Sequence, residues 1–404
     1  MSKSHGDIHP MSPPRPRTKR PRDIDSQVPP TSSGTSSHCQ TSSTPTSTST
    51  YSSASTPIAY DHPITESFED YHHDIYNTDT PPAGTTMPDS SQLLICTACG
   101  TQFDTEDALL LRRCRICDDP RQFVPPTGQA FTTLSALRSS PQKYTNKRKP
   151  FFKDDRFWSI WTEPKIAIGQ RAILIKTELG NVLWDCITFL DDETRNWINE
   201  QGGLAAIVIS HPHYYSTHLE WAEAFDCPVY LSWEDKEWLN RLDRLGKARC
   251  FIEGKEEEIE IGGEKSGVVA LKLGGHFPGS LCVLAFGRLL VADTIVTVPA
   301  GLGDWSAGPH GTEDGRPKDS NSYSFMWSIP NIIPLSPPEI QGMWDVLESH
   351  EFTSTHGAFV GTEVSDGYGG SNKSVKERVL ESMQIQVRSM GWKDHKLLKE
   401  EIIL

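Results

Sequence analysis

The chain has 404 residues and a net charge of −14 at pH 7, with 36% hydrophobic and 23% charged residues. This length allows two or three domains. No run of about 18 apolar residues is present, so we expect no membrane-spanning helix. The polar N-terminus lacks the apolar segment of a secretory signal. An acidic chain is a poor generic binder of nucleic acid, so we expect a small-molecule substrate and neither nucleic acid nor membrane as a partner.

The first 92 residues form a tail that we predict to be disordered. The segment is rich in Ser, Thr and Pro, and it cannot bury enough apolar surface to offset the entropy lost on ordering. Its basic run Arg15–Arg22 is either a nuclear import signal or a solvated charged stretch. Nine cysteines without a secretory signal indicate a reducing compartment, cytoplasmic or nuclear. The tail also leaves room for protein partners.

Four cysteines form two CxxC pairs, Cys96 with Cys99 and Cys114 with Cys117, and 14 residues separate the pairs. Four thiolates in two such turns can surround a zinc ion tetrahedrally. The alternatives are two accidental pairs or a redox dithiol. The spacing favours a zinc-ribbon-like module over residues 93–137, which a structural metal would stabilise because so small a module has little core of its own.

After a connector at 138–149, strand and helix patterns alternate from 150 to the end of the chain. This intermixing predicts an α/β or α+β class in layers. One helix follows a predicted capping box, Thr217 with Glu220, and two others begin at Asp191 and Ser336. Strands are predicted at 158–161, 171–176, 182–186, 204–210, 228–231, 268–273, 281–286, 289–292 and 352–355, and further helices at 234–245 and 374–390.

Imidazole and carboxylate side chains follow several of these predicted strands. His211 and His213 are spaced so that extended chain places both on one side, where they can bind one ion. His276 lies in a Gly-rich turn, Asp293 ends an apolar run, and His356 follows the last predicted strand. A carboxylate at a buried strand end requires a cation or hydrogen-bond donors. Together these residues predict a metal site.

In this order, the motifs resemble those of the metallo-β-lactamase superfamily. The resemblance rests on Trp184-Asp185, the HPH motif, the GHFPGS turn, Asp293-Thr294 and His356-Gly357. It implies an αββα sandwich over residues 150–404. It also implies that His211, His213 and His276 form a first metal site, with Asp293 bridging or binding beside it and His356 serving a second. The cysteine module looks like an extension found in a eukaryotic branch.

The chain departs from the family pattern HxHxDH, because Tyr215 and Ser216 stand where that pattern has Asp and His. The expected second site therefore loses two ligands. His218 could replace one of them, or it could be an exposed histidine. Tyr215 could bind the metal or donate its hydroxyl to a developing oxyanion, or it could be a core aromatic residue.

These residues predict a metal-dependent hydrolase in which a zinc-bound hydroxide attacks an ester, thioester or amide carbonyl. Tyr215 and Asp293 are the candidate catalytic residues, and the site is mononuclear or has an altered second metal position. One zinc ion is expected in the ribbon and one or two in the hydrolase-like site. The alternative is a non-catalytic scaffold of the same fold. A nuclease is disfavoured because two-metal phosphodiester cleavage needs the depleted second site.

Overall fold

The computed structural model describes residues 89–244, 246–306, 317 and 319–402 of the chain. Residues 1–88 of the predicted disordered tail, with its basic run Arg15–Arg22, lie outside the described residues. Its last residues differ from the prediction, because Ser90–Gln92 form a 3₁₀ helix. Among those that are described, no helix has the length and apolar character needed to cross a membrane.

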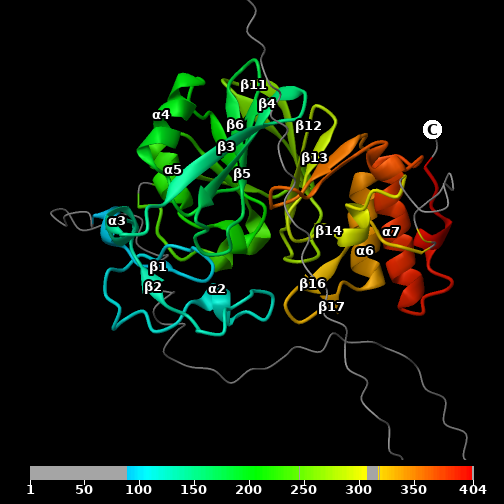
Figure 1. Cartoon of the computed structure of the whole chain (residues 1–404), viewed down its shortest axis with the longest axis horizontal. Coiled ribbons are helices and arrows are strands. Elements are labelled where there is room, and N and C mark those ends of the chain that lie inside the picture. Colours follow the sequence, from blue (N-terminus) through cyan, green and yellow to red (C-terminus); the bar gives the residue numbers. More distant parts are fainter. Residues whose placement is uncertain (1–88, 245, 307–316, 318, 403–404) are drawn as a thin grey trace, which may run out of the picture. The chain divides into compact units, whose positions relative to one another are not determined.

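Two mixed β-sheets form the centre of the fold (Figure 1). In the first sheet, β3 to β6 pair antiparallel and β6 to β9 pair parallel. In the second, all neighbours pair antiparallel except β13 and β18. The first sheet has the order β3 (Thr145–Phe151), β4 (Asp154–Glu163), β5 (Ala172–Lys176), β6 (Asn181–Trp184), β7 (Ala206–Val208), β8 (Val229–Ser232) and β9 (Arg249–Ile252). The second has the order β10 (Glu256–Ile261), β11 (Glu264–Lys272), β12 (Leu281–Ala285), β13 (Arg288–Leu290), β18 (Ser354–His356) and β19 (Glu363–Ser365).

Buried side chains alternate between the two faces along the strands of the second sheet, so each face of this sheet packs in a hydrophobic core. In β12, Leu281 and Val283 join residues of the first sheet in one buried cluster, whereas Cys282 joins a second cluster with the C-terminal helices. Successive side chains of a strand point to opposite faces, so this division follows from the β geometry. The two sheets therefore pack face to face, and the second sheet also packs against helices.

Helices cover the outer faces of both sheets, which gives the αββα layers (Figure 1). Helices α4 (Asp192–Glu200) and α5 (His218–Phe225) bury Ile198 and Trp221 in the cluster of the first sheet. Helices α6 (Pro337–Leu347) and α7 (Val375–Ser389) pack on the second sheet. The side chain of Asp191 caps α4, as predicted, by accepting a hydrogen bond from the backbone of Thr194 at 2.8 Å. The predicted layered α/β architecture is thus confirmed.

Three further local predictions are wrong. Most of the expected connector at 138–149 belongs to helix α3 (Leu134–Ser139) and to edge strand β3. The expected helix at 234–245 is a 3₁₀ helix, Trp233–Trp238, and no α-helix follows in the described residues up to 244. The expected capping box before α5 does not form: Thr217 donates to the carbonyl of Thr188 at 3.0 Å and Glu220 pairs with Arg241. In the last two cases tertiary contacts override local preference.

A small module precedes the sandwich, and two short two-stranded sheets lie among its later loops. The module contains β1 and β2, which pair antiparallel, together with the short α-helices α2 and α3. The bounds of these remaining elements are β1 (Ile95–Cys96), α2 (Arg115–Asp118), β2 (Phe131–Thr132), β14 (Val296–Thr297), β15 (Tyr323–Ser324), β16 (Met326–Ser328) and β17 (Ile333–Pro334).

The core between α7 and the second sheet allows a matched test of packing. Met383 of α7 is fully buried, whereas Met390, just after the helix, is 38% exposed. We expect Met383→Ala to lower the free energy of unfolding by about 2–5 kcal/mol, because it removes buried methylene groups and leaves a cavity. Met390→Ala should change it by less than about 0.5 kcal/mol. Urea unfolding of both variants measures the difference, and equal losses would contradict this packing.

Candidate metal centre

Loops from both sheets carry the predicted site residues. Strand β7 ends at Val208, shortly before His211, and the 3₁₀ helix Pro212–Tyr214 places His213 beside it. His276 lies in the loop between β11 and β12, and Asp293 follows β13. Gly275 permits this turn because its φ is +85° and a Cβ there would lie 2.8 Å from the hydroxyl oxygen of Thr294. The two sheets thus bring separate segments of the chain to one place.

The structure brings His211, His213, His276 and Asp293 together, with one donor atom from each lying within 4.8 Å of the others. Asp293 Oδ2 lies 3.4 Å from His211 Nε2, 3.7 Å from His213 Nδ1 and 3.9 Å from His276 Nε2. His276 Nε2 lies 3.3 Å from His213 Nδ1. Donor atoms around a tetrahedral ion, with bonds of about 2.0–2.1 Å, are about 3.3–3.4 Å apart. The group could therefore hold one metal ion.

Hydrogen bonds on the outer side of two rings orient their free nitrogens toward the group. His276 Nδ1 contacts the carbonyl oxygen of Met326 at 3.3 Å, and His211 Nδ1 contacts Ser210 Oγ at 2.9 Å. The carboxylate of Asp185 in turn accepts from the backbone of Ser210 at 2.8 Å. Among the described residues, His211 Nε2 is buried without a hydrogen-bond partner. A buried nitrogen with a free lone pair is what a cation requires.

Burial keeps the imidazoles of His213 and His276 neutral and therefore able to act as ligands. It lowers the pKa of His213 to about 4 and that of His276 well below its ordinary value. Burial opposes ionisation of Asp293, but the nearby imidazoles of His211 and His213 outweigh it and hold the pKa of this carboxyl well below its usual range. At neutral pH the group therefore offers the neutral imidazoles of His213 and His276 and one carboxylate, which suits a divalent cation such as zinc.

Tyr214, which the sequence reasoning did not select, contacts the group directly. Its hydroxyl donates to Asp293 Oδ1 at 2.9 Å, and its ring centre lies 4.6 Å from that of His211. The bond to Oδ1 turns the other carboxylate oxygen, Oδ2, toward the histidines. The only signal in the sequence is that Tyr214 directly follows the HPH motif.

The neighbouring Tyr215, which the sequence favoured as catalytic, points elsewhere. Its hydroxyl donates to the backbone oxygen of Asp235 at 3.1 Å, and its side chain is buried in the core. This is the arrangement of a core aromatic residue with a satisfied hydroxyl.

His218 is not available as a replacement ligand. Its Nδ1 contacts the carbonyl oxygen of Tyr215 at 2.8 Å, and Arg249 Nε donates to its Nε2 at 2.9 Å. Burial, and then the charge of Arg249, lower the pKa of His218 well below its ordinary value, so the ring is neutral. Both nitrogens are occupied, which corrects the prediction that this side chain could bind a metal.

The structure does not bring His356 to the group either. Its ring stacks on Phe151 with centres 4.3 Å apart, and its Nε2 contacts Ser354 Oγ at 3.0 Å. Burial, and then the charges of Arg171 and Arg288, lower the pKa of His356 well below its ordinary value. In the described residues, the groups of three or more such side chains that could hold a metal are this His/Asp group and the cysteine cluster, and His356 belongs to neither.

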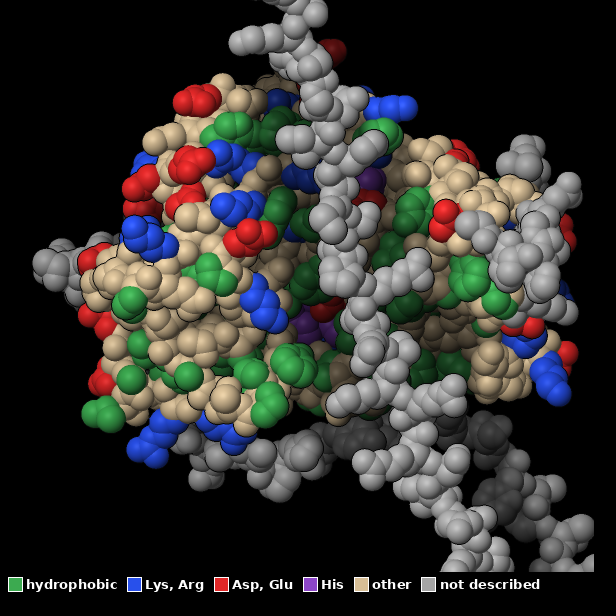
Figure 2. Space-filling view, viewed as in Figure 1, with side chains coloured by type: hydrophobic (Ala, Val, Ile, Leu, Met, Phe, Trp, Pro, Cys, Tyr) green, Lys and Arg blue, Asp and Glu red, His purple; other side chains and the backbone are tan. Residues whose placement is uncertain are grey.

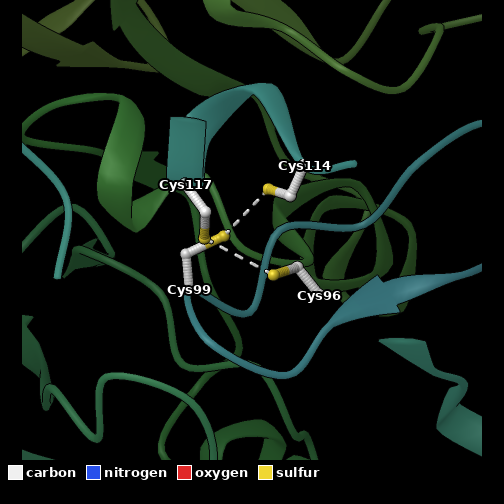
Figure 3. Close-up of side chains that lie close together, drawn as sticks. All are labelled: Cys96, Cys99, Cys114 and Cys117. Carbon is white, nitrogen blue, oxygen red and sulfur yellow. Dashed lines mark hydrogen bonds between the residues drawn. The ribbon is translucent and has the colours of Figure 1, made fainter. Parts of the chain in front are cut away.

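The four cysteines of the N-terminal module converge, as Figure 3 shows. Cys96 Sγ lies 3.5 Å from Cys117 Sγ, and Cys99 Sγ lies 3.6 Å from Cys114 Sγ. A disulfide would need about 2.05 Å, whereas a tetrahedral ion with metal–sulfur bonds of about 2.3 Å would place the sulfurs about 3.8 Å apart. All four are buried. This cluster could hold a structural metal ion, as predicted.

The His/Asp group lies just beneath the surface of the molecule, with Asp293 as its accessible member. Asp293 keeps a side-chain exposure of 17%, while the three imidazoles are nearly inaccessible. Figure 2 shows histidine side chains in a hollow near the centre of the view, with hydrophobic side chains around it. A ligand could therefore reach Asp293 from solvent without displacing the histidines.

The two facing sheets, the outer helices and the His/Asp group at the strand ends define a protein of the metallo-β-lactamase fold with a candidate metal site. No family model matches the sequence. The chain is 38% identical over 298 residues to the uncharacterized protein YmaE of Bacillus subtilis (strain 168), an alignment that covers 72% of this chain and 92% of that protein. The chain belongs to the family of YmaE. This relative is bacterial, which corrects the expectation of a eukaryotic branch.

Several solved structures are similar at low sequence identity. TMB-1 is 14% identical with a TM-score of 0.39, covering 61% of this chain and 98% of that one. A metallo-β-lactamase from Pontibacter korlensis is 14% identical with a TM-score of 0.37, covering 59% and 99%. DIM-1 metallo-β-lactamase exposed to ceftazidime is 10% identical with a TM-score of 0.37, covering 60% and 97%. The fold assignment rests on the sheet order and the core layers described above.

The two adjacent tyrosines allow a matched test of the site. Tyr214→Phe removes the donor to Asp293 Oδ1, so we expect about 10- to 100-fold weaker metal binding at the His/Asp group. Tyr215→Phe removes a hydroxyl that bonds to Asp235, and metal affinity should stay within about twofold of wild type, because outer partners act only on the ligands they touch. Competition with a chromogenic chelator measures both affinities. A larger effect for Tyr215 would reverse the assignment.

His218→Gln tests whether that residue is structural. Below its ordinary pKa of 6.5, unfolded His218 binds a proton that the folded protein excludes. Stability is therefore lost as the pH falls through 6.5, by up to about 1.4 kcal/mol per pH unit. The variant should show a shallower fall between pH 6.5 and 5 in urea unfolding, with its metal content unchanged. Loss of the metal from the His/Asp group would instead identify His218 as a ligand.

Proposed function

We propose that this protein is a metal-dependent hydrolase that acts on a carbonyl substrate, an ester, thioester or amide, with one zinc ion in the His/Asp group. The observation that supports this proposal is the group itself. Three imidazole nitrogens face one point and could hold a tetrahedral ion whose fourth position stays open to water, and the carboxylate of Asp293 remains accessible beside them. A bound divalent cation there would polarise a carbonyl oxygen and acidify a water molecule.

The residues around that position have distinct roles in the proposed reaction. His211, His213 and His276 would supply the ligand nitrogens. Asp293 Oδ2 lies close to all three and is the group able to accept the proton of an attacking water, while Tyr214 holds the other oxygen in place. Because Tyr215 and Ser216 replace the second pair of family ligands, we propose a mononuclear site.

A second candidate, a non-catalytic metal-holding scaffold, is favoured by one observation. Tyr215, His218 and His356 are each engaged in contacts away from the group, so the partner set of a two-metal hydrolase is absent from the described residues. Such a protein would bind a metal at the His/Asp group without hydrolysing any substrate, and activity measurements separate it from the hydrolase.

The hydrolase proposal is tested with zinc-loaded protein and a panel of esters, thioesters, lactones, amides and phosphodiesters. We expect hydrolysis of at least one carbonyl class. His276→Ala should lower that activity by more than about 100-fold, because even outer partners of metal ligands contribute 10- to 100-fold. The control is His350→Ala, since His350 pairs with Glu256 at 3.0 Å, outside the His/Asp group. A folded, zinc-loaded protein inactive on the whole panel would favour the scaffold.

A further inference from the structure

The cysteine module contacts both of the loops that carry the histidines. Following its first CxxC turn, the backbone N–H of Gln102 donates to the carbonyl oxygen of Ser216 at 3.1 Å, at the end of the loop that begins with His211. Following its second, Arg121 Nη1 donates to the carbonyl oxygen of His276 at 3.1 Å. Each CxxC turn is therefore linked to a different ligand-bearing loop.

Arg121 is held rigidly in this position. Its guanidinium forms a two-pronged ion pair with Asp119, at 2.7 and 2.8 Å, and both side chains are about nine-tenths buried. The guanidinium carbon also lies 3.6 Å from the ring centre of Phe277, the residue next to His276. A planar, paired and stacked guanidinium has little freedom to move. The backbone on which His276 sits is therefore fixed from outside the sandwich.

Pro120, which lies between Asp119 and Arg121, contacts the segment that holds the ring of His276. Its carbonyl oxygen accepts hydrogen bonds from Ser328 Oγ at 2.6 Å and from Asn331 Nδ2 at 2.7 Å. Ser328 ends strand β16, and Met326 of the same strand offers its carbonyl oxygen to His276 Nδ1 at 3.3 Å. Both the backbone and the ring of His276 thus depend on the segment 119–121, only two residues beyond Cys117.

We propose that the cysteine module is a positioning element for the His/Asp metal centre, and that Arg121 is the residue through which it acts on His276. This inference rests on the proposed metal binding at that group. In the structure Arg121 contacts none of the four donor atoms, so its role is to hold the ligand loop and not to take part in chemistry. A metal held by the four cysteines would fix the short helix α2 and, through Asp119, the position of Arg121.

The test uses the full-length protein loaded with Co²⁺, whose thiolate and imidazole/carboxylate sites have distinguishable absorption bands. Arg121→Ala removes the contact, and Arg121→Lys keeps the charge but loses the planar fork. The matched control is Arg113→Ala, because Arg113 lies in the same module, pairs with Asp118 and has a side-chain exposure of 73%. The readout is the Co²⁺ affinity of each site by chelator competition, with no measurement of activity.

We expect Arg121→Ala to weaken Co²⁺ binding at the His/Asp group by about 10- to 100-fold while the thiolate band is retained. Arg121→Lys should recover part of the loss, and Arg113→Ala should match wild type. Equal affinities in Arg121→Ala and wild type would overturn the inference, as would loss of the thiolate band, which would show that Arg121 only maintains the module. Absence of the imidazole/carboxylate band in wild type would instead reject the metal site on which the proposed function rests.

Discussion

Four polar side chains from two different β-sheets meet at one buried point, and the rest of the structure depends on satisfying them. Imidazoles and a carboxylate are costly to bury unless a cation or hydrogen-bond partners compensate. Here the outer nitrogens of His211 and His276 have such partners, while His211 Nε2 has none among the described residues. The donor atoms face a common centre instead, so a cation would complete the arrangement that the fold has built.

The sandwich explains how residues more than 80 positions apart in sequence come to share this centre. Strands β7 and β13 belong to different sheets, and each ends beside the same hollow. Because the sheets pack face to face through strand residues such as Ile207 and Val283, their loops cannot separate without disrupting the core. The packing of the sheets therefore holds the strand ends together, and the contact of Arg121 with the carbonyl oxygen of His276 adds a constraint on the loop itself.

Much of the site was predictable because its ligands lie in short motifs after predicted strands. The convergence of these ligands requires only that their strands end at the same edge of the sandwich. The ligands are His211, His213, His276 and Asp293. His356 was not predictable in this way, since its side-chain direction depends on the register with Leu290 and on Phe151. The αββα layers were predicted from the resemblance, which rests on the order of the motifs. Composition alone does not predict them.

Other contacts could not be predicted from the sequence, because they join residues that lie far apart along the chain. Tyr214 and Tyr215 are adjacent, yet a 3₁₀ helix turns one hydroxyl toward Asp293 and the other toward Asp235. The role of Arg121 depends on a contact with a residue 155 positions away. The failed helix at 234–245 has the same origin, because Trp238 packs against Phe277 with ring centres 5.5 Å apart.

The number of metal ions per chain tests the central claim most directly. Elemental analysis of zinc-reconstituted protein should give two ions per chain, and one in the double variant His211→Ala/His213→Ala, with its fold checked by circular dichroism. A normally folded double variant that still binds two ions, or a wild-type protein that binds only the ion of the cysteine cluster, would contradict a metal centre built from these histidines.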